Sequence, residues 1–464
     1  MEAIRKEETK PQKQMNQREM PFKQLLGDGI GQFGMTLLGT LTAVLLFYYT
    51  DVVGISAGLV GTLLLVARFS DGFTDLFMGN VIDNTKSKHG KARPWILWMV
   101  FPAMIAAIAL FNVPDIGSTG QAVYILVTNI IFFSICMTIL TVAYFSLMAL
   151  TTRNHHDRSL IGITRALFNV PGGMLMSAGL IPILAAFGGG QQTWTIAIII
   201  ISSIAVITLL ITFKTSKEIV TSTERTEIER KMPYKEKVKI LFKNKYLVKL
   251  LLAGVFINTL FNINTAAGVY YAIYIWEDVN LVAVIGGVTF LPLIFVLFLL
   301  PPIIKKFGKK QVIIVGSVMG IIGNMVRLID PYSISVGLTG MLIVSIGLVP
   351  LIALIGPMIN DTIEYGEWQS NVRMEATVNG FNSFVTKAGV GIGTAIVAWS
   401  LAFGGYAEGQ ATQPDLANHM IIAMNTYIPA LLYVIMIISL ARYDLYKIYP
   451  SIIADLEKRN NQTE

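Results

Sequence analysis

Two carboxylates lie inside a stretch of the chain that is otherwise apolar. Asp71 and Asp75 belong to the apolar block that runs from about Ala57 to Val81. Their spacing of four residues places both side chains on one face of a helix. Two adjacent carboxylates repel each other unless a cation or a proton lies between them. The pair therefore predicts a site for sodium or a proton.

Hydroxyl oxygens near this pair would suit sodium, because hard cations prefer several oxygen ligands. Thr74 could supply one from the same helix, and Thr138 another from the fourth apolar block. If the coupling ion is sodium, Asp71 and Asp75 are its predicted metal ligands. Arg68 is expected to be a structural partner of the carboxylates. The alternative is that Asp75 lies near the cytoplasmic end of its helix and only caps it or pairs with loop cations.

Two further cations lie inside apolar blocks, where a charge is costly unless it is paired or hydrated. Lys387 is surrounded by small residues, which permit close helix packing. It could pair with Asp71 or Asp75, or its ammonium could extend to the membrane interface. Arg165 could bind sugar hydroxyls or a carboxylate through two hydrogen bonds, or it could form a structural ion pair.

Asp28 and Gln32 open the first apolar block and are candidates for substrate binding. Asp28 could instead mark the start of a helix, where a carboxylate interacts favourably with the helix dipole. Paired aromatic residues could stack on sugar rings, although an interfacial aromatic belt explains them equally well. These pairs are Tyr48-Tyr49, Tyr144-Phe145 and Tyr270-Tyr271.

The amino-acid composition indicates what class of protein holds these side chains. Of the 464 residues, 54% are hydrophobic and only 14% are charged, whereas soluble proteins carry about 25% charged residues. This balance argues against a cytosolic enzyme, a disordered chain and a nucleic-acid-binding domain. The single cysteine, Cys136, excludes an internal disulfide and a cysteine-based zinc site. None of the four histidines has a spaced metal partner, so we expect no such metal cluster and no cofactor.

Apolar blocks about 20 residues long recur twelve times, which is long enough to cross a bilayer as helices. They are too uniformly apolar for barrel strands, so we predict an all-α integral membrane protein. The blocks are approximately 29–50, 57–81, 94–113, 122–150, 161–187, 194–213, 247–276, 281–304, 312–328, 333–357, 378–402 and 420–440.

Lys and Arg are distributed asymmetrically among the connecting segments. All but four of the 36 lie in the two tails, in the central segment or in alternate loops. The exceptions are Arg68, Arg165 and Lys387 inside apolar blocks, and Arg327 in an opposite loop. The positive-inside rule then places both termini in the cytoplasm. It also explains the net charge of +7 without nucleic acid.

A polar central stretch divides the twelve blocks into two sets of six. We expect a cytoplasmic tail at 1–26, a six-helix lobe at 27–214, a cytoplasmic linker at 215–246, a second six-helix lobe at 247–441 and a cytoplasmic tail at 442–464. Gly90-Lys91 and Gly308-Lys309 follow the second block of each half as a weak internal repeat. This organisation fits a two-lobed transporter with its substrate site near the membrane midplane.

Several of these residues also carry a resemblance to a known family. The chain resembles the glycoside–pentoside–hexuronide:cation symporters, the group that contains the melibiose and glucuronide permeases. The match runs from about Gly27 to Tyr446. The segments that carry it are Tyr48-Tyr49-Thr50-Asp51-Val52-Val53-Gly54, Val66 to Asp75 with Met78-Gly79, Gly90-Lys91-Ala92-Arg93-Pro94-Trp95, and Asp361-Thr362-Ile363-Glu364-Tyr365-Gly366-Glu367 followed by Arg373, Glu375 and Lys387.

The resemblance implies a major-facilitator fold and secondary symport. It implies that Asp71 and Asp75 ligate the coupling cation with help from Thr138. It also implies that Arg165 and Lys387 line the sugar and cation region. By the same resemblance, Asn382 and Ser383 lie beside the sugar.

Three departures from the melibiose permease pattern concern the ligands. Thr74 replaces an asparagine cation ligand, which leaves sodium and proton coupling both open. Thr141 and Phe145 replace the sugar-binding aspartate of the fourth helix and its neighbouring tryptophan. The first-helix sugar aspartate falls at Met35, unless an insertion gives that role to Asp28 or Gln32. These changes put melibiose-type galactoside recognition in doubt and would also suit a uronide or a less polar glycoside.

We therefore predict a multi-pass protein of the inner membrane that moves a glycoside, pentoside or hexuronide inward with Na⁺ or H⁺ by alternating access. Its expected partners are the sugar, the cation and membrane lipids, without nucleic acid. One alternative is a carrier of the same fold for a lipid or an amphipathic drug-like molecule. Another is a membrane sugar sensor that does not transport. An enzyme is not expected, because the blocks hold no embedded histidine, cysteine nucleophile or metal cluster.

Overall fold

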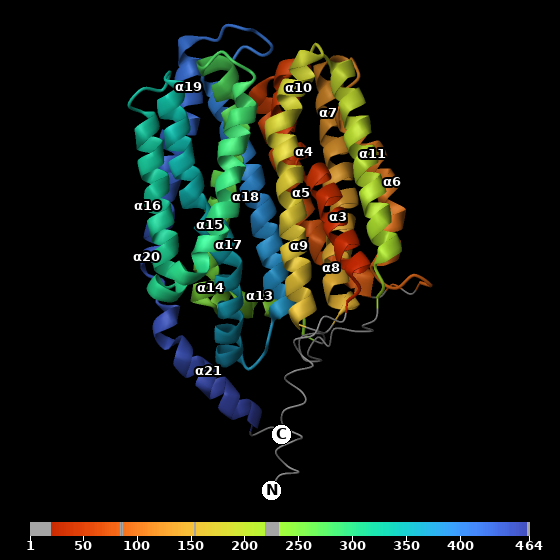
Figure 1. The fold of residues 1–464 in the computed structure, drawn as a ribbon, viewed down its shortest axis with the longest axis vertical. Coiled ribbons are helices and arrows are strands. Elements are labelled where there is room, and N and C mark those ends of the chain that lie inside the picture. Colours follow the sequence, from red (N-terminus) through yellow and green to blue (C-terminus); the bar gives the residue numbers. More distant parts are fainter. Residues whose placement is uncertain (1–19, 84, 86, 153–154, 219–231, 462–464) are drawn as a thin grey trace. The chain divides into compact units, whose positions relative to one another are not determined.

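The computed structural model describes residues 20–83, 85, 87–152, 155–218 and 232–461. Its regular elements are all helical, which confirms the predicted fold class (Figure 1). Parts of the predicted tails and linker, together with Arg153 and Lys86, lie outside the described residues.

The first six predicted blocks correspond to helices that are interrupted in places by short π-helical turns. Pro94 and Pro171 lie at the start of one helix and inside another. In chain order the elements are α3 Phe22–Gly39, α4 Leu41–Phe47, η1 Tyr48–Val52, α5 Ala57–Asp83, α6 Arg93–Leu110, α7 Gly117–Asn129, η2 Ile130–Met137, α8 Thr138–Thr151, α9 His155–Met174, η3 Leu175–Gly179, α10 Leu180–Ala186 and α11 Gln191–Thr215.

The second six blocks correspond to a further set of helices, flanked by two that contain many charged residues. The elements are α13 Tyr234–Lys243, α14 Lys245–Tyr270, η4 Tyr271–Ile275, α15 Leu281–Phe307, α16 Lys309–Arg327, α17 Ile334–Ser370, α18 Glu375–Phe403, α19 Asp415–Asn425, α20 Tyr427–Ala441 and α21 Leu445–Asn461.

Among the described residues, eleven helical segments are long and apolar enough to cross a membrane. The second predicted block, α5, has 27 residues but is not one of the eleven. Its charged side chains Arg68, Asp71 and Asp75 reduce its hydropathy. Among the twelve predicted spans, the one that falls short is therefore the one that carries the two candidate carboxylate ligands.

Arg327 does not lie in a loop as the sequence suggested. It is the last residue of α16 and is 1% exposed. Its guanidinium donates to the backbone oxygen of Asn425 and, at 3.3 Å, to the side-chain oxygen of the same residue. Asn425 ends α19, so the cation satisfies carbonyl oxygens where the last span is interrupted.

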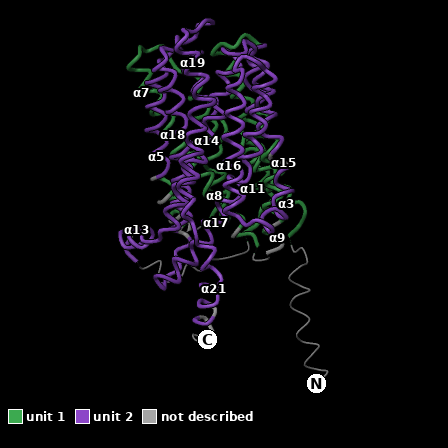
Figure 2. The backbone as a smooth tube through the Cα atoms, turned by 90° about the vertical axis from the view of Figure 1, so that its left-hand side faces the viewer, with its two compact units in different colours: residues 1–42, 74–176, 187–223 green, residues 43–73, 177–186, 224–464 purple. Residues whose placement is uncertain are grey.

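The chain forms two compact units (Figure 2). Unit 1 contains residues 1–42, 74–176 and 187–223, and unit 2 contains residues 43–73, 177–186 and 224–464. The segments 43–73 and 177–186 of the first half therefore pack with second-half helices. The expected lobe boundaries at 214 and 247 stay a prediction.

In unit 1, helix α3 packs between α9 and α11. Gly27, Gly31 and Gly34 recur on one face of α3. A Cβ atom at any of the three would lie within 2.1 Å of a threonine hydroxyl on α11. A Cβ at Gly29 would meet Thr164 on α9 at 2.5 Å. The absence of side chains thus brings the backbones close and holds Asp28 beside α9.

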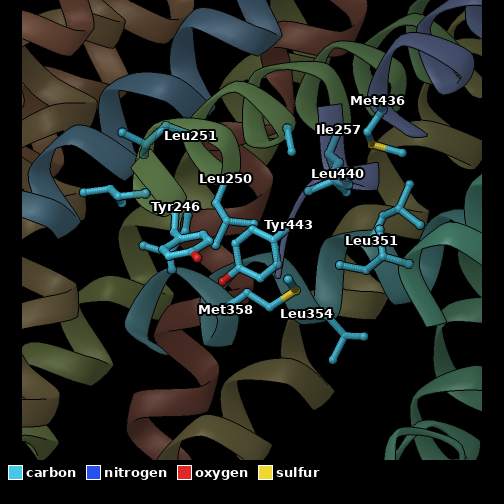
Figure 3. Close-up of a cluster of buried hydrophobic side chains, with 14 of the residues drawn as sticks. Tyr246, Leu250, Leu251, Ile257, Leu351, Leu354, Met358, Met436, Leu440 and Tyr443 are labelled. Carbon is cyan, nitrogen blue, oxygen red and sulfur yellow. The ribbon is translucent and has the colours of Figure 1, made fainter. Parts of the chain in front are cut away.

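In unit 2, the core is built mainly from α14, α17 and α20. Figure 3 shows Leu250 and Tyr246 of α14 with Met358 of α17 and Tyr443, which follows α20. Tyr246 and Tyr443 contact edge to face, with ring centroids 5.5 Å apart. This packing supports α14 and α17, and α14 in turn packs against α18.

Candidate functional site

Arg165 and Asp28 form a buried ion pair within unit 1. The Nε of Arg165 donates to Asp28 Oδ2 at 2.7 Å, and a terminal nitrogen donates to Oδ1 at 2.8 Å. Arg165 is 6% exposed and Asp28 is 5% exposed. A two-pronged geometry of this kind is a strong form of arginine–carboxylate contact. The guanidinium charge is therefore compensated inside the protein.

Tyr144 completes the environment of Arg165, a role that the sequence did not reveal. Its hydroxyl donates to the backbone oxygen of Asp28 at 2.6 Å, and its own backbone oxygen accepts from Arg165 at 3.0 Å. The guanidinium carbon lies 4.1 Å from the centre of the Tyr144 ring. Tyr144 is fully buried, so it cannot stack on a sugar.

Phe145, by contrast, is half exposed and lies 5.3 Å from the Arg165 guanidinium. The other predicted aromatic pairs do not share this property. Because these tyrosines are buried, they neither stack on a sugar nor form an interfacial belt. Both interpretations of the two pairs are therefore wrong. The fully buried members are Tyr48, Tyr49, Tyr270 and Tyr271.

A polar group lies one helical turn from the ion pair on α3 and α9. Gln32 Nε2 donates to Thr36 Oγ1 at 3.2 Å and to Asn169 Oδ1 at 3.4 Å, and Thr36 Oγ1 donates to Asn169 Oδ1 at 2.6 Å. Asn169 is exposed, and a Cβ atom at Gly162 on the same helix would meet open space. An exposed amide inside a membrane span is costly in lipid, so Asn169 is a candidate for substrate binding.

Asn169 and Thr36 were missed by the sequence interpretation. Each lies four residues after a candidate that it identified, Arg165 and Gln32 respectively. That spacing places each beside its candidate on one helix face, and this signal could have found both.

Helix α8 connects this polar group with the predicted cation ligands in unit 1. Thr138, Thr141 and Phe145 follow one another at spacings of three and four residues, and so lie on one face. Thr138 Oγ1 is 3.4 Å from Thr74 Oγ1 on α5. Asp75, which follows Thr74 in the sequence, is half-buried.

In unit 2, Arg68 and Asp71 form a second buried ion pair on α5. The N–O distance is 3.0 Å, and Asp71 is 1% exposed. This geometry is the structural pairing that the sequence suggested for Arg68. Because α5 is continuous from Ala57 to Asp83, Asp75 follows Asp71 one helical turn later.

The residues around Lys387 place it on the face of α18 that meets α5. A Cβ atom at Gly72 of α5 would meet the Phe384 ring at 2.1 Å, and one at Gly391 would meet Arg68 Cβ at 2.8 Å. Lys387 lies three residues after Phe384 and four before Gly391, and so on the same face. It is half-buried.

Asn382 and Ser383 lie about one helical turn before Lys387 in the sequence. Both are half-buried on α18. Of the predicted substrate-binding residues, the structure brings Asp28, Gln32, Arg165 and Phe145 together within unit 1. Asn382, Ser383 and Lys387 belong to unit 2.

The predicted cation ligands are carboxylates and hydroxyls on α5 and α8. No group of three His, Cys, Asp or Glu residues within the described part of the chain could hold a metal ion. Asp71, Asp75, Thr74 and Thr138 offer carboxylate and hydroxyl oxygens, which are ligands for hard cations.

The family model described as MFS/sugar transport protein matches residues 27–447. The chain belongs to this family. The resemblance to the glycoside–pentoside–hexuronide:cation symporters is therefore confirmed. The protein is a multi-pass membrane transporter rather than an enzyme.

Two curated relatives align with nearly the whole chain. An isoprimeverose transporter of Lactiplantibacillus pentosus is 30% identical, and the alignment covers 98% of this chain and 95% of that protein. A glucuronide carrier protein homolog of Escherichia coli strain K12 is 27% identical over 87% of this chain and 88% of its own.

The fold is also found in solved transporter structures. A bacterial homolog of the human lysosomal transporter Spinster, in an inward-facing and unoccupied conformation, superposes with a TM-score of 0.64. Its sequence identity is 14%, and the match covers 94% of this chain and 99% of that one. The likeness places the protein in the major-facilitator fold.

Proposed function

We propose that this protein imports a glycoside, pentoside or hexuronide across the cell membrane together with Na⁺ or H⁺. The observation that carries the proposal is the arrangement on α5, where Asp71 is buried against Arg68 and Asp75 follows one turn later. A carboxylate pair at this depth is costly unless it is functional or compensated. Both termini lie in the cytoplasm in this proposal.

The cation would bind to the carboxylates with help from Thr74 and Thr138. Arg68 pairs with Asp71 at 3.0 Å, and a bound cation or proton would change the balance of charge around the carboxylates. Lys387, on the α18 face that meets α5, would respond to the same change in charge and so link cation loading to the packing of the two helices.

The substrate surface of unit 1 is suited to an uncharged sugar. Arg165, its buried cation, is already paired with Asp28. Gln32 and Asn169 present amides, and Phe145 presents a ring face. These groups bind hydroxyls and the apolar face of a sugar. We therefore favour a neutral glycoside, such as the isoprimeverose named for one relative, over the glucuronide named for the other.

The test is uptake into proteoliposomes that contain the purified protein. Radiolabelled isoprimeverose and a glucuronide are supplied separately, each with an inward Na⁺ gradient, an inward H⁺ gradient or neither. We expect isoprimeverose to be concentrated with one of the gradients, and the glucuronide to be taken up more slowly.

Neutral variants then test the coupling site. Asp71→Asn and Asp75→Asn should abolish accumulation but retain exchange of sugar at equal concentrations. Asp415→Asn, in the first turn of α19, is the matched control and should behave as the parent protein. The proposed coupling role is wrong if both site variants still concentrate the sugar against its gradient.

A further inference from the structure

A cavity of about 680 Å³ opens in unit 2, where η1, η4 and the loop after α18 meet. Its lining includes Phe47, Asp51, Tyr274 and Asn418, together with the loop 409–413. These segments connect spans on the side opposite the Lys- and Arg-rich loops. The positive-inside rule makes that side the outer one.

Asp51 and Tyr274, which line the cavity, belong to a hydrogen-bonded cluster centred on Asp51. Tyr274 and Tyr406 both donate their hydroxyls to Asp51 Oδ1, and Tyr406 also lies within 2.8 Å of the Tyr274 hydroxyl. Thr50 donates to Asp51 Oδ2 at 2.5 Å, and its hydroxyl is 2.9 Å from that of Tyr270. One carboxylate therefore joins three separate segments, and we name this cluster the Asp51 latch.

The packing beneath the latch belongs to α5 and α18. A Cβ atom at Gly61 of α5 would lie 2.3 Å from Ala398 Cβ on α18. The backbone N–H of Ala57 donates to Glu408 Oε1 at 3.1 Å. An opening of this side would therefore separate α5 from α18 and break the contact between Ala57 and Glu408.

The cavity wall has the chemistry of a carbohydrate site rather than an anion site. It offers two carboxylates, Asp51 and Glu277, and among its described lining residues there is no Lys or Arg. Asn418 Oδ1 is buried and, within the described part of the chain, accepts no hydrogen bond. Phe47 and Tyr274 add aromatic surface. Carboxylates and amide oxygens accept hydrogen bonds from sugar hydroxyls.

Glu277 is also held in an unusual backbone conformation. Its φ of 53° lies in the left-handed region, which residues other than glycine rarely adopt. Such positions often persist where the surroundings serve a function. Here the turn keeps an exposed carboxylate at the cavity wall, two residues after the end of η4, the helix that carries Tyr274.

We propose that this cavity is an outer docking site for a neutral carbohydrate, and that the sugar opens the Asp51 latch. Hydroxyls of the arriving sugar replace those of Tyr274 and Tyr406 on the Asp51 carboxylate. η1 is thereby released from η4 and from the loop after α18. The identity of the ligand as a sugar rests on the proposed function.

A single-cysteine reporter tests the latch. Cys136, the sole cysteine, is buried and is replaced by Ser, and Ala395→Cys is added on α18. Ala395 is 1% exposed and faces Gly61. A maleimide reagent is applied to purified protein in detergent, so that membrane orientation does not affect the result. The rate of modification then measures separation of α5 from α18.

Removing the latch should expose the reporter. We expect Asp51→Asn and Tyr406→Phe to raise the modification rate by about tenfold, since the first removes the charge of the acceptor and the second removes a donor to it. Tyr427→Phe removes a hydroxyl from an exposed tyrosine and should leave the rate unchanged. Isoprimeverose should raise the rate in the latch-intact reporter protein but not in Asp51→Asn.

Glu277→Gln separates docking from latch opening. Because Glu277 is exposed, this variant should fold normally, keep the slow basal rate and need about tenfold more isoprimeverose for the same increase. The proposal is overturned if Tyr406→Phe leaves the rate unchanged in folded protein, or if the sugar acts equally on Asp51→Asn and the intact latch. The basal rates of maleimide modification are measured without a gradient and without sugar. They therefore test the latch even if the proteoliposomes take up no sugar and the proposed function is wrong.

Discussion

At the scale of single residues, the pairing of Arg165 changes how its function is understood. An arginine inside a membrane span suggests a direct ligand for an anionic substrate. The structure instead gives it a carboxylate partner, a carbonyl oxygen and an aromatic ring. Asp28 compensates its charge and the Tyr144 ring lies against it, so in the proposed function the nearby amides, rather than Arg165, contact the substrate.

This pairing predicts strong coupling between the two side chains. Removing one partner leaves the other charge buried and uncompensated, at a cost of about 3–5 kcal/mol. Asp28→Asn and Arg165→Gln should therefore each lower the thermal unfolding temperature markedly. The double variant Asp28→Leu/Arg165→Met should lose much less than the sum of the single effects. Thermal unfolding in detergent measures this, and additive losses would exclude the coupling.

Thr138 carries a second residue-scale prediction. Thr138→Val keeps the shape of the side chain but removes an oxygen beside Thr74. If sodium is the coupling ion, the concentration that half-saturates uptake should rise about tenfold, in line with the loss of one contact to a charged group. Thr128→Val, earlier in the same span, is the control. An unchanged sodium dependence would remove Thr138 from the site.

At the scale of elements, glycine faces decide how closely the helices approach. Gly347 of α17 lies against α16, where a Cβ atom would be 2.4 Å from the Gly316 backbone oxygen. A Cβ atom at Gly356, farther along the same helix, would meet nothing within 4 Å. The two positions have similar local sequence but different surroundings.

These surroundings predict opposite effects of the same substitution. Gly347→Ala should destabilise the protein by roughly 1–3 kcal/mol, because the added methyl overpacks a helix contact. Gly356→Ala should be neutral or stabilising by up to about 1 kcal/mol, since alanine favours helix over glycine. Unfolding in detergent distinguishes them, and equal effects would refute the close packing of α16 and α17.

At the scale of the whole molecule, the charge distribution predicts sidedness. In a background without Cys136, Gln410→Cys at the outer cavity should react with an impermeant maleimide on intact cells. Lys235→Cys on α13 should react only after the membrane is permeabilised. Both residues are exposed, so accessibility within the protein does not limit either reaction. The reverse pattern would invert the proposed topology.

The local sequence was sufficient for the features that depend on composition and periodicity. Twelve apolar blocks correspond to helices in the structure, and the motifs between Gly27 and Tyr446 identified the family that the comparisons show. Hydropathy and spacing are properties of consecutive residues, so they survive in any packing arrangement. The same holds for Asp71 and Asp75, whose spacing on one helix needs no tertiary information.

Tertiary structure alone decided which side chains meet. Asp28 lies 137 positions from Arg165, and Asp51 lies 355 positions from Tyr406, so no local pattern could pair them. Tyr144 and Phe145 are adjacent in sequence, yet one is buried beneath a cation and the other is exposed, because neighbouring residues on a helix point in different directions. The glycine contacts of α3 and α18 set the distances between helices, and those distances determine which polar groups can hydrogen-bond to one another.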